Sequence, residues 1–379
     1  MINLLNKKRI MIATGGTGGH INPGIAVAGL IREKYPDAQI LFVGTAVKME
    51  AQLVPAAGYD FRTIDIQGFS RDLTPAGIAK NIKTLFLLVK SSSQAKKIIK
   101  EFKPDVVIGF GGYVSGPVLK TAASMGIPTA VHEQNAFPGV TNKSLAKKVD
   151  RVMLTSAEAE KYMKPKNPCV VTGLPVRGEM IHADRDISRA ELKVDERPVI
   201  LSMGGSLGAK VINEAVTQLI AERYQNENCY FLHATGKAGV GMFDVLKNEK
   251  KIDLEANKHI MLREYIDDMY RCMAAADLVI CRAGASSLSE IQAMGKPSIL
   301  VPYPYAAENH QYHNAMALVK NDAAILIEEK DFTGERLIKE VDALLENPER
   351  LRTIGENAAK MAIYDASERI VNCICEIVK

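Results

Sequence analysis

The chain has 379 residues, of which 47% are hydrophobic and 24% charged, with a formal net charge of +4. These values are typical of a globular protein of about two domains, and so small a net charge argues against a nucleic-acid partner. The six cysteines are scattered without a C-x-x-C pair, which excludes a disulfide framework and a zinc site. No apolar run reaches the roughly 18 residues of a membrane span, so we expect a cytosolic or surface-bound protein.

Short apolar runs alternate with stretches of helical length along the whole chain. Runs of this kind, bounded by turns, predict buried parallel strands separated by helices. The expected strands are 9–13, 40–43, 106–108, 129–132, 152–154, 199–203, 230–234, 260–262, 278–281 and 298–301.

The chain also repeats its architecture. The strand 9–13 runs into Gly15-Gly16-Thr17-Gly18-Gly19, and the strand 199–203 runs into Gly204-Gly205-Ser206-Leu207-Gly208. Two doubly wound, Rossmann-like α/β domains with parallel sheets are the simplest account. We expect an N-terminal domain over 1–177, a C-terminal domain over 178–353, and a last helix within 354–379 that is able to pack back on the first domain.

Both glycine-rich turns join a strand to a helix, a combination that suits pyrophosphate because glycine permits close approach and helix N-termini present free N–H groups. A third such turn is Gly109-Phe110-Gly111-Gly112. The alternative is a tight turn without a ligand. The first turn is not a dinucleotide fingerprint, because Ile21 replaces the third glycine, and neither turn carries the G-K-[ST] of a Walker loop.

The stretch Arg282-Ala283-Gly284-Ala285-Ser286-Ser287-Leu288-Ser289-Glu290 follows another apolar strand. Its small and hydroxyl residues suit a phosphate at a helix N-terminus, and Glu290 could accept both hydroxyls of a ribose. Glu290 could equally be an acidic residue that favours the helix dipole.

Several motifs taken together resemble those of the bacterial GT-B glycosyltransferases that convert lipid I to lipid II in peptidoglycan synthesis, the MurG family. The resemblance runs nearly end to end. It rests on Gly15 to His20, Gly111 to Pro117, His132-Glu133-Gln134-Asn135, Pro175-Val176-Arg177, Gly204 to Ala209, Tyr265 to Met269, Arg282 to Glu290, and Gln311-Tyr312 with Asn314-Ala315.

The resemblance implies the GT-B fold, in which the two domains face each other across a cleft, and donor binding mostly by the second domain. Ile266 would meet uracil through its backbone, Glu290 the ribose, and Gln311 the sugar hydroxyls. The diphosphate would be bound by Arg177, Ser206 and the turn Ala285, Ser286, Ser287, Leu288 and Ser289. In the first domain, Thr17, Gly18, Gly19 and Asn135 would face the transferred sugar, and Gly15, Gly16, Gly111, Gly112 and Tyr113 the acceptor pyrophosphate.

The implied reaction is inverting transfer of N-acetylglucosamine from UDP-N-acetylglucosamine to lipid I, the undecaprenyl-pyrophosphoryl-MurNAc-pentapeptide. It serves peptidoglycan and cell wall synthesis, and with it cell shape and division. It implies a peripheral protein on the cytoplasmic side of the cell membrane. This sequence departs from the family pattern at Leu174, Leu207 and His310, and it lacks tryptophan.

We expect no cofactor and no metal, because helix N-termini and Arg177 can stabilise the leaving UDP. Asp184-Arg185-Asp186 matches a metal-binding D-x-D pattern, but it lies in a polar stretch and follows no apolar strand. His310 and His313 share a helix face, yet no third ligand is evident.

The segment 73–102 interleaves Ile78, Ile82, Leu85, Phe86 and Val89 with Lys80, Lys83, Lys90, Lys96, Lys97 and Lys100. Such a helix suits an anionic membrane surface. The alternative is an ordinary amphipathic helix whose apolar side faces the core.

His20 is the candidate general base. The positive end of the helix dipole favours its neutral imidazole, which can accept the proton of the attacking hydroxyl. The alternative is a positional role, in which His20 donates a hydrogen bond to the acceptor pyrophosphate.

Three other functions remain open from the sequence. They are a GT-B glycosyltransferase with another lipid acceptor, a UDP-sugar epimerase, and a nucleotide-sugar binding protein without turnover.

Overall fold

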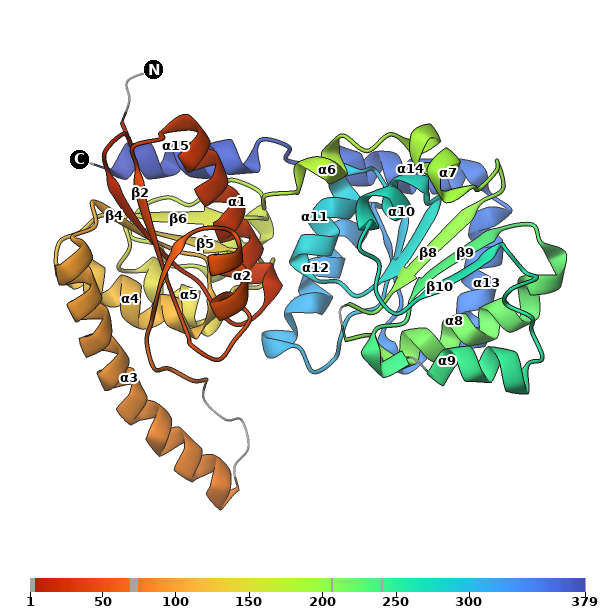
Figure 1. Ribbon diagram of the computed structural model, residues 1–379, viewed down its shortest axis with the longest axis horizontal. Helices are drawn as coiled ribbons and strands as arrows, with labels where there is room; N and C mark the ends of the chain where they lie inside the picture. Colours follow the sequence, from red (N-terminus) through yellow and green to blue (C-terminus); the bar gives the residue numbers. More distant parts are fainter. Residues whose placement is uncertain (1–3, 69–73, 206, 240, 379) are drawn as a thin grey trace. The chain divides into compact units, whose positions relative to one another are not determined.

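The computed structural model describes residues 4–68, 74–205, 207–239 and 241–378 (Figure 1). It contains two compact units. Unit 1 comprises Met1–Pro175 and Asp365–Lys379, and unit 2 comprises Val176–Tyr364.

Unit 1 is built on a seven-stranded parallel sheet with the strand order β3-β2-β1-β4-β5-β6-β7. Its strands are β1 (Arg9–Ala13), β2 (Gln39–Gly44), β3 (Asp60–Thr63), β4 (Val106–Gly109), β5 (Thr129–Glu133), β6 (Arg151–Leu154) and β7 (Val170–Val171). Its helices are α1 (Gly18–Lys34), α2 (Glu50–Ala56), α3 (Pro75–Phe102), α4 (Gly112–Ser124), α5 (Val140–Ala146), η1 (Ala157–Tyr162) and α15 (Ala366–Ile377).

Unit 2 repeats this plan with a six-stranded parallel sheet in the order β10-β9-β8-β11-β12-β13. Its strands are β8 (Val199–Met203), β9 (Tyr230–Ala234), β10 (Ile260–Arg263), β11 (Leu278–Cys281), β12 (Ser298–Leu300) and β13 (Ile325–Leu326). Its longer helices are α7 (Arg185–Leu192), α8 (Lys210–Arg223), α11 (Ala285–Ala293), α12 (His310–Val319), α13 (Gly334–Leu345) and α14 (Pro348–Lys360). Shorter ones are α6 (Gly178–Ile181), η2 (Tyr224–Asn226), η3 (Lys237–Gly239), α9 (Gly241–Asp244), η4 (Val245–Glu249), α10 (Met269–Ala275), η5 (Ala307–Asn309) and η6 (Glu329–Asp331).

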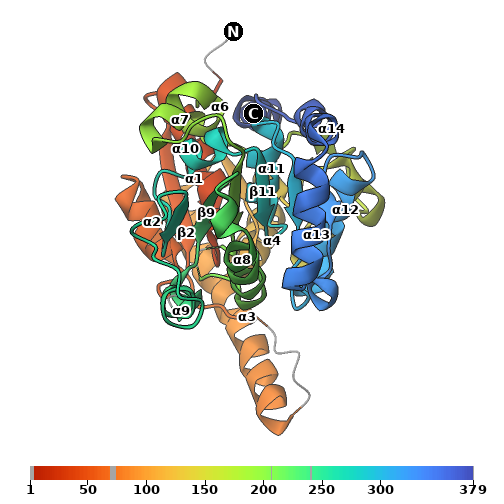
Figure 2. The ribbon, with the colours of Figure 1, turned by 90° about the vertical axis from the view of Figure 1, so that its right-hand side faces the viewer.

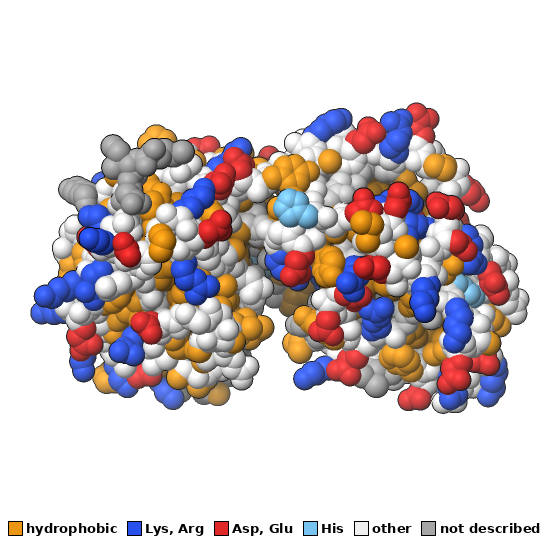
Figure 3. Space-filling model, turned by 45° about the horizontal axis from the view of Figure 1, so that its top comes forward, with side chains coloured by type: hydrophobic (Ala, Val, Ile, Leu, Met, Phe, Trp, Pro, Cys, Tyr) orange, Lys and Arg blue, Asp and Glu red, His pale blue; other side chains and the backbone are white. Residues whose placement is uncertain are grey.

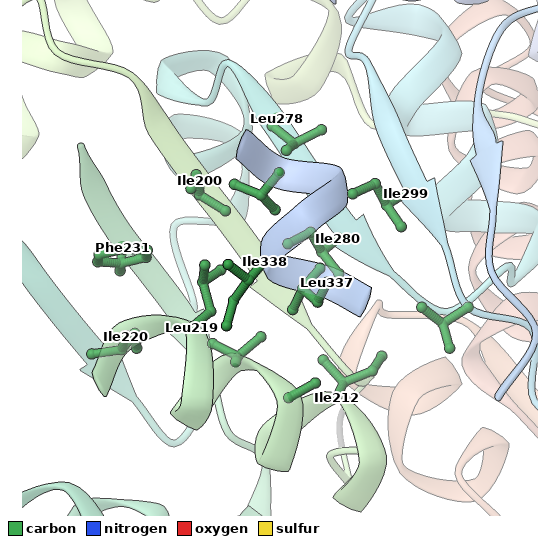
Figure 4. Packing of buried hydrophobic residues seen from close by; sticks show 14 of the residues in the cluster. Ile200, Ile212, Leu219, Ile220, Phe231, Leu278, Ile280, Ile299, Leu337 and Ile338 are labelled. Carbon is green, nitrogen blue, oxygen red and sulfur yellow. The ribbon is translucent and has the colours of Figure 1, made fainter. Parts of the chain in front are cut away.

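The central strands are apolar throughout because helices cover both faces of each sheet. In unit 2, for example, Ile200 and Ile280 point toward α8 and α13, where they pack with Ile212, Leu219 and Leu337 (Figure 4). Val199 and Leu201 point to the other face and pack with residues of α10 and α11. The two doubly wound, Rossmann-like domains that the sequence predicts are thus confirmed.

In both units the sheet reverses its strand order beside the first strand, between β1 and β4 and between β8 and β11. Ligands of open parallel sheets bind beyond the carboxyl ends of the strands at such a reversal. The glycine turns after β1, β4 and β8 and the turn before α11 all lie at these two positions.

Three strands and one helix differ from the sequence-based expectations. The strands β3, β7 and β13 were not expected, because they are short edge strands that are largely exposed or only partly buried. The single last helix expected within 354–379 is two helices. The first, α14, packs against α11 in unit 2, and the second, α15, packs against α1 and β6 in unit 1 (Figure 1).

The helix α3 extends beyond the other elements of unit 1 in both ribbon views (Figures 1 and 2). Its second half is anchored by Ala95, Ile98 and Ile99, which are buried against the sheet.

The space-filling view shows basic and acidic side chains interspersed over the face of the molecule that Figure 3 presents. Among the described residues, none of the helices combines the length and the apolar character that crossing a membrane requires.

Candidate active site

The glycine turn after β1 is held by a buried carboxylate. Glu50, at the start of α2, accepts hydrogen bonds from the Gly16 amide (3.0 Å) and from the Thr45 amide (3.0 Å) and hydroxyl (2.7 Å). Its side chain lies so close to Gly15 that a Cβ there would come within 2.7 Å of Oε1. Sequence reasoning missed Glu50, although an acidic residue soon after the second strand of a Rossmann-like fold is a signal that could have found it.

The turns after β1 and β4 meet at the strand reversal. A Cβ at Gly112 would lie 2.3 Å from the carbonyl oxygen of Gly15, so this contact requires glycine, and the φ of +75° at Gly112 does too. A Cβ at Gly111 would lie 2.7 Å from Cδ2 of His20. The structure therefore brings together the predicted residues Gly15, His20, Gly111 and Gly112, while Thr17, Gly18 and Gly19 form the start of α1.

The end of β5 forms the third side of this region. Glu133 is buried and accepts hydrogen bonds from the Asn135 amide (2.9 Å), the Gly139 amide (3.1 Å) and Asn142 Nδ2 (2.8 Å). Burial raises the pKa of Glu133, and these donors oppose the shift. Asn135 also donates from Nδ2 to Glu133 (3.1 Å), so its side chain is oriented by a buried carboxylate.

Tyr113 lies in the first turn of α4, and its side chain is 58% exposed. Its ring lies against Gly68, where a Cβ would come within 2.2 Å of the ring.

In unit 2 the glycine turn after β8 packs against the end of β9. A Cβ at Gly208 would lie 2.2 Å from the carbonyl oxygen of Thr235, and Gly208 has a φ of +82°. The same carbonyl accepts a hydrogen bond from Asn213 Nδ2 in the first turn of α8 (2.9 Å). The predicted phosphate ligand Ser206 lies outside the described residues.

A buried histidine supports this turn from below, and sequence reasoning missed it. His233 in β9 forms hydrogen bonds with Ser202 Oγ through Nδ1 (2.7 Å) and with Asn213 Oδ1 through Nε2 (3.0 Å). Burial lowers the pKa of His233 to about 4, so the ring is neutral. Because Asn213 donates from Nδ2 to Thr235, its Oδ1 accepts, and the proton of His233 is on Nε2.

The predicted ribose and diphosphate ligands of unit 2 lie together as an ion pair. Arg177, the residue before α6, donates to Oε1 of Glu290 from Nε (3.2 Å) and from Nη2 (3.1 Å). Burial raises the pKa of Glu290, and the Arg177 guanidinium opposes the shift. Glu290 is the sixth residue of α11, beyond the first turn in which the helix dipole acts.

The remaining residues that were predicted to bind the donor occupy other turns of unit 2. Ala285, Ser286, Ser287 and Leu288 form the first turn of α11, and Ser289 follows them. Ile266 follows β10, and its side chain is buried in the core with Leu288, which leaves its backbone as the part able to bind a ligand. Gln311, in α12, accepts a hydrogen bond from the Tyr303 amide (2.9 Å).

The two possible metal motifs of the sequence have structural explanations. Asp184 of the D-x-D pattern accepts a hydrogen bond from the Ile187 amide (2.8 Å) and so caps α7. His310 Nδ1 lies 2.7 Å from the Ala307 carbonyl oxygen. Within the described part of the chain, no three His, Cys, Asp or Glu groups are placed to hold a metal.

Comparisons with known proteins agree with this geometry. Residues 10–154 match the family described as "Glycosyltransferase family 28 N-terminal domain". Residues 199–370 match the family described as "Glycosyltransferase family 28 C-terminal domain". A relative from Acetivibrio thermocellus is 45% identical over 98% of both chains. It is named a UDP-N-acetylglucosamine–N-acetylmuramyl-(pentapeptide) pyrophosphoryl-undecaprenol N-acetylglucosamine transferase.

Two solved structures are also similar. The crystal structure of Acinetobacter baumannii MurG has a TM-score of 0.78 and 30% identity, with 97% of this chain and 99% of that chain covered. A Listeria monocytogenes protein described as a putative UDP-N-acetylglucosamine 2-epimerase has a TM-score of 0.66. It is 18% identical, with 97% of this chain and 95% of that chain covered, which shows a shared fold alone. The chain therefore belongs to glycosyltransferase family 28 and, within it, to the MurG family of N-acetylglucosaminyltransferases, as its sequence motifs predicted.

Proposed function

We propose that this protein transfers N-acetylglucosamine from UDP-N-acetylglucosamine to the MurNAc-pentapeptide of undecaprenyl-pyrophosphate-linked lipid I, with inversion and release of UDP. The observation that carries the proposal is 45% identity, over nearly the full length of both chains, to a relative named for this reaction. The predicted donor and acceptor residues also gather at the strand reversals of two Rossmann-like sheets.

Unit 2 binds the donor in this proposal. The turns around Gly205 and Gly208 and the N-terminus of α11 direct amide groups toward the space beyond β8 and β11, which suits a diphosphate. Glu290 accepts the ribose hydroxyls, and Arg177 lies beside it to meet the phosphates. As the bond to the sugar breaks, these positive groups stabilise the charge that develops on UDP.

Unit 1 receives the acceptor pyrophosphate and the sugar ends of both substrates. The N-termini of α1 and α4 are adjacent, as the contact between Gly15 and Gly112 requires, so both helix dipoles favour an anion there. His20 lies between these turns and accepts the proton of the attacking hydroxyl. The oxygen of that hydroxyl then forms its bond to the anomeric carbon while the bond from that carbon to UDP breaks.

The helix α3 attaches the protein to the cytoplasmic face of an anionic membrane in this proposal. Its side chains Ile82, Leu85, Phe86 and Val89 are 65%, 56%, 73% and 74% exposed, whereas Thr84 and Ser91 face inward and are buried. An ordinary amphipathic helix would bury these apolar side chains, so their exposure supports membrane binding over that alternative. Lys83, Lys96, Lys97 and Lys100 on the same helix are exposed and suit anionic head groups. Leu73 and the side chains of Ile78 and Lys80 lie outside the described residues.

The experiment that tests the function is UDP release with a lipid-linked sugar pyrophosphate as acceptor and UDP-N-acetylglucosamine, UDP-glucose or UDP-galactose as donor. We expect release that requires the acceptor and favours UDP-N-acetylglucosamine. A protein that makes a new UDP-sugar without acceptor would be an epimerase, and one that binds UDP without turnover would be a binding protein. Transfer only to a different lipid would indicate another glycosyltransferase.

A further inference from the structure

Gln134 follows β5 in unit 1, and its side chain amide is fixed in one orientation. The residue is 3% exposed, and Nε2 lies 3.0 Å from the Phe110 carbonyl oxygen and 3.2 Å from His132 Nδ1. His132 Nε2 lies 2.8 Å from the Gly173 carbonyl oxygen, which can only accept, so Nε2 carries the ring proton. His132 Nδ1 is therefore an acceptor, and the two N–H groups of Gln134 serve Phe110 and His132.

This orientation leaves the amide oxygen of Gln134 beside Gly111, a residue that also lies close to His20. A Cβ at Gly111 would lie 3.1 Å from Gln134 Oε1 and 3.1 Å from His20 Nε2, so both atoms lie close to the backbone of Gly111. An amide flip would place Oε1 against the Phe110 oxygen and is unfavourable. Oε1 is buried and has no hydrogen-bond partner among the described residues.

A buried acceptor without a donor is costly, so a group that donates a hydrogen bond is expected to reach Oε1 in the working enzyme. An ionised pyrophosphate has no proton to give, and its oxygens would be repelled by Oε1. Sugar hydroxyls and acetamide N–H groups do donate. We infer that Gln134 Oε1 accepts a hydrogen bond from a hydroxyl or acetamide N–H of a sugar bound beside His20, and so helps to orient that sugar for transfer. The inference rests on the proposed function.

The test combines variants of Gln134 with substrates that lack single groups. Gln134→Met keeps the size of the side chain but removes the oxygen, and Gln134→Glu keeps an oxygen at that position. Gln39→Met is the matched control, because Gln39 is exposed at the first residue of β2, whereas Gln134 follows the last residue of β5. Each is assayed for kcat/KM with deoxy and N-methyl acetamide analogues of the lipid acceptor, and separately with deoxy UDP-sugars.

We expect Gln134→Met to lower kcat/KM roughly 10- to 100-fold with unmodified substrates and Gln39→Met to leave it unchanged. With the original chain, one analogue should have a kcat/KM lower by a similar factor than the unmodified substrate. With Gln134→Met, the same analogue should react as fast as the unmodified substrate, because the hydrogen bond that it lacks is already absent. Whether that analogue is an acceptor or a UDP-sugar identifies which sugar Gln134 contacts.

Two results would overturn the inference. One is a Gln134→Met variant as active as the original chain. The other is equal losses for every analogue with and without the substitution, which would mean that Gln134 serves only the structure or binds a buried water. If Gln134→Met fails to fold, the comparison is made between Gln134→Glu and the original chain. Failure of the original chain to transfer sugar to any lipid pyrophosphate would instead reject the proposed function.

Discussion

Arg177 and Glu290 form an ion pair in unit 2, and the pairing limits what each can offer to a nucleotide. Both donated hydrogen bonds go to Oε1 of Glu290. This contact holds the carboxylate in place and opposes the effect of burial, which raises the pKa of Glu290. In the proposed donor site, Arg177 thus orients Glu290 for its proposed contact with the ribose, in addition to its own proposed contact with the diphosphate.

Replacing Glu290 tests the ribose contact. A hydrogen bond to a charged group contributes about 1.5–3 kcal/mol, so Glu290→Ala should weaken UDP binding roughly 10- to 150-fold in calorimetry. Glu340→Ala is the control, since Glu340 pairs with Arg336 (3.1 Å) on α13 with a similar side-chain exposure. Unchanged UDP affinity in folded Glu290→Ala would remove this residue from the site. In Arg177→Ala the pKa of Glu290 should rise further. As pH decreases, the UDP affinity of this variant should therefore begin to fall at a higher pH than that of the original chain.

His20 is tested by separating rate from binding. A general base contributes roughly 10²- to 10⁴-fold in rate, so His20→Ala should lower kcat by that order and abolish the acid limb of the kcat–pH profile. The KM for UDP-N-acetylglucosamine should stay nearly constant. If only the acceptor KM rises while kcat and its pH dependence persist, His20 binds the pyrophosphate and the base lies elsewhere.

His132 and His233 should make the protein acid-sensitive. Burial lowers the pKa of each to about 4, whereas an unfolded histidine titrates near 6.5. As pH falls below about 6.5, these histidines bind protons in the unfolded chain but not in the folded chain. The free energy of unfolding should therefore fall by up to about 1.4 kcal/mol per pH unit for each histidine. Urea unfolding from pH 7 to 5 measures this slope, and His233→Gln should flatten it. An identical slope in that variant would contradict the assignment.

At the scale of elements, a sequence predicts those strands whose burial requires a continuous run of apolar residues. The strand Val199–Met203 was predicted to the residue, because both of its faces are covered and it is apolar throughout. The edge strand Asp60–Thr63 was not, since much of it is exposed and its pattern is polar. The break after Lys360 has no glycine or proline to mark it. Contacts such as that of Glu50 with Gly16 depend on how distant segments pack, which no local pattern records.

The exposed apolar side of α3 predicts reversible membrane binding. Replacing Ile82, Leu85 and Phe86 with serine should weaken binding to anionic vesicles roughly 100-fold, at about 1 kcal/mol for each partly inserted side chain. Activity on a short-chain soluble acceptor should survive, because these side chains are exposed and their loss leaves the core intact. Ile187→Ser, at a residue 62% exposed on α7, is the control. Unfolding of the triple variant would mean that the three residues belong to the core.

At the scale of the whole molecule, the chain ends in the unit where it began. The helix α15 buries Ile370, Val371 and Ile374 against unit 1, and its flanks form ion pairs from Glu368 to Lys34 (2.7 Å) and from Glu376 to Arg151 (2.7 Å). Unit 1 therefore lacks part of its core until α15 has been made, whereas unit 2 is continuous in sequence.

A chain that stops at Tyr364 should lose unit 1 and keep unit 2. Full burial of each of the three apolar side chains contributes roughly 1.5–3 kcal/mol, and their sum is comparable to the 5–15 kcal/mol that stabilises a typical domain. Hydrogen exchange should then show fast exchange throughout β1 to β6 and unchanged protection in β8 to β12. In the full-length chain, Ile374→Ala should destabilise unit 1 alone by about 2–5 kcal/mol. Equal protection of unit 1 in the truncated chain would show that α15 covers a core that is already stable without it.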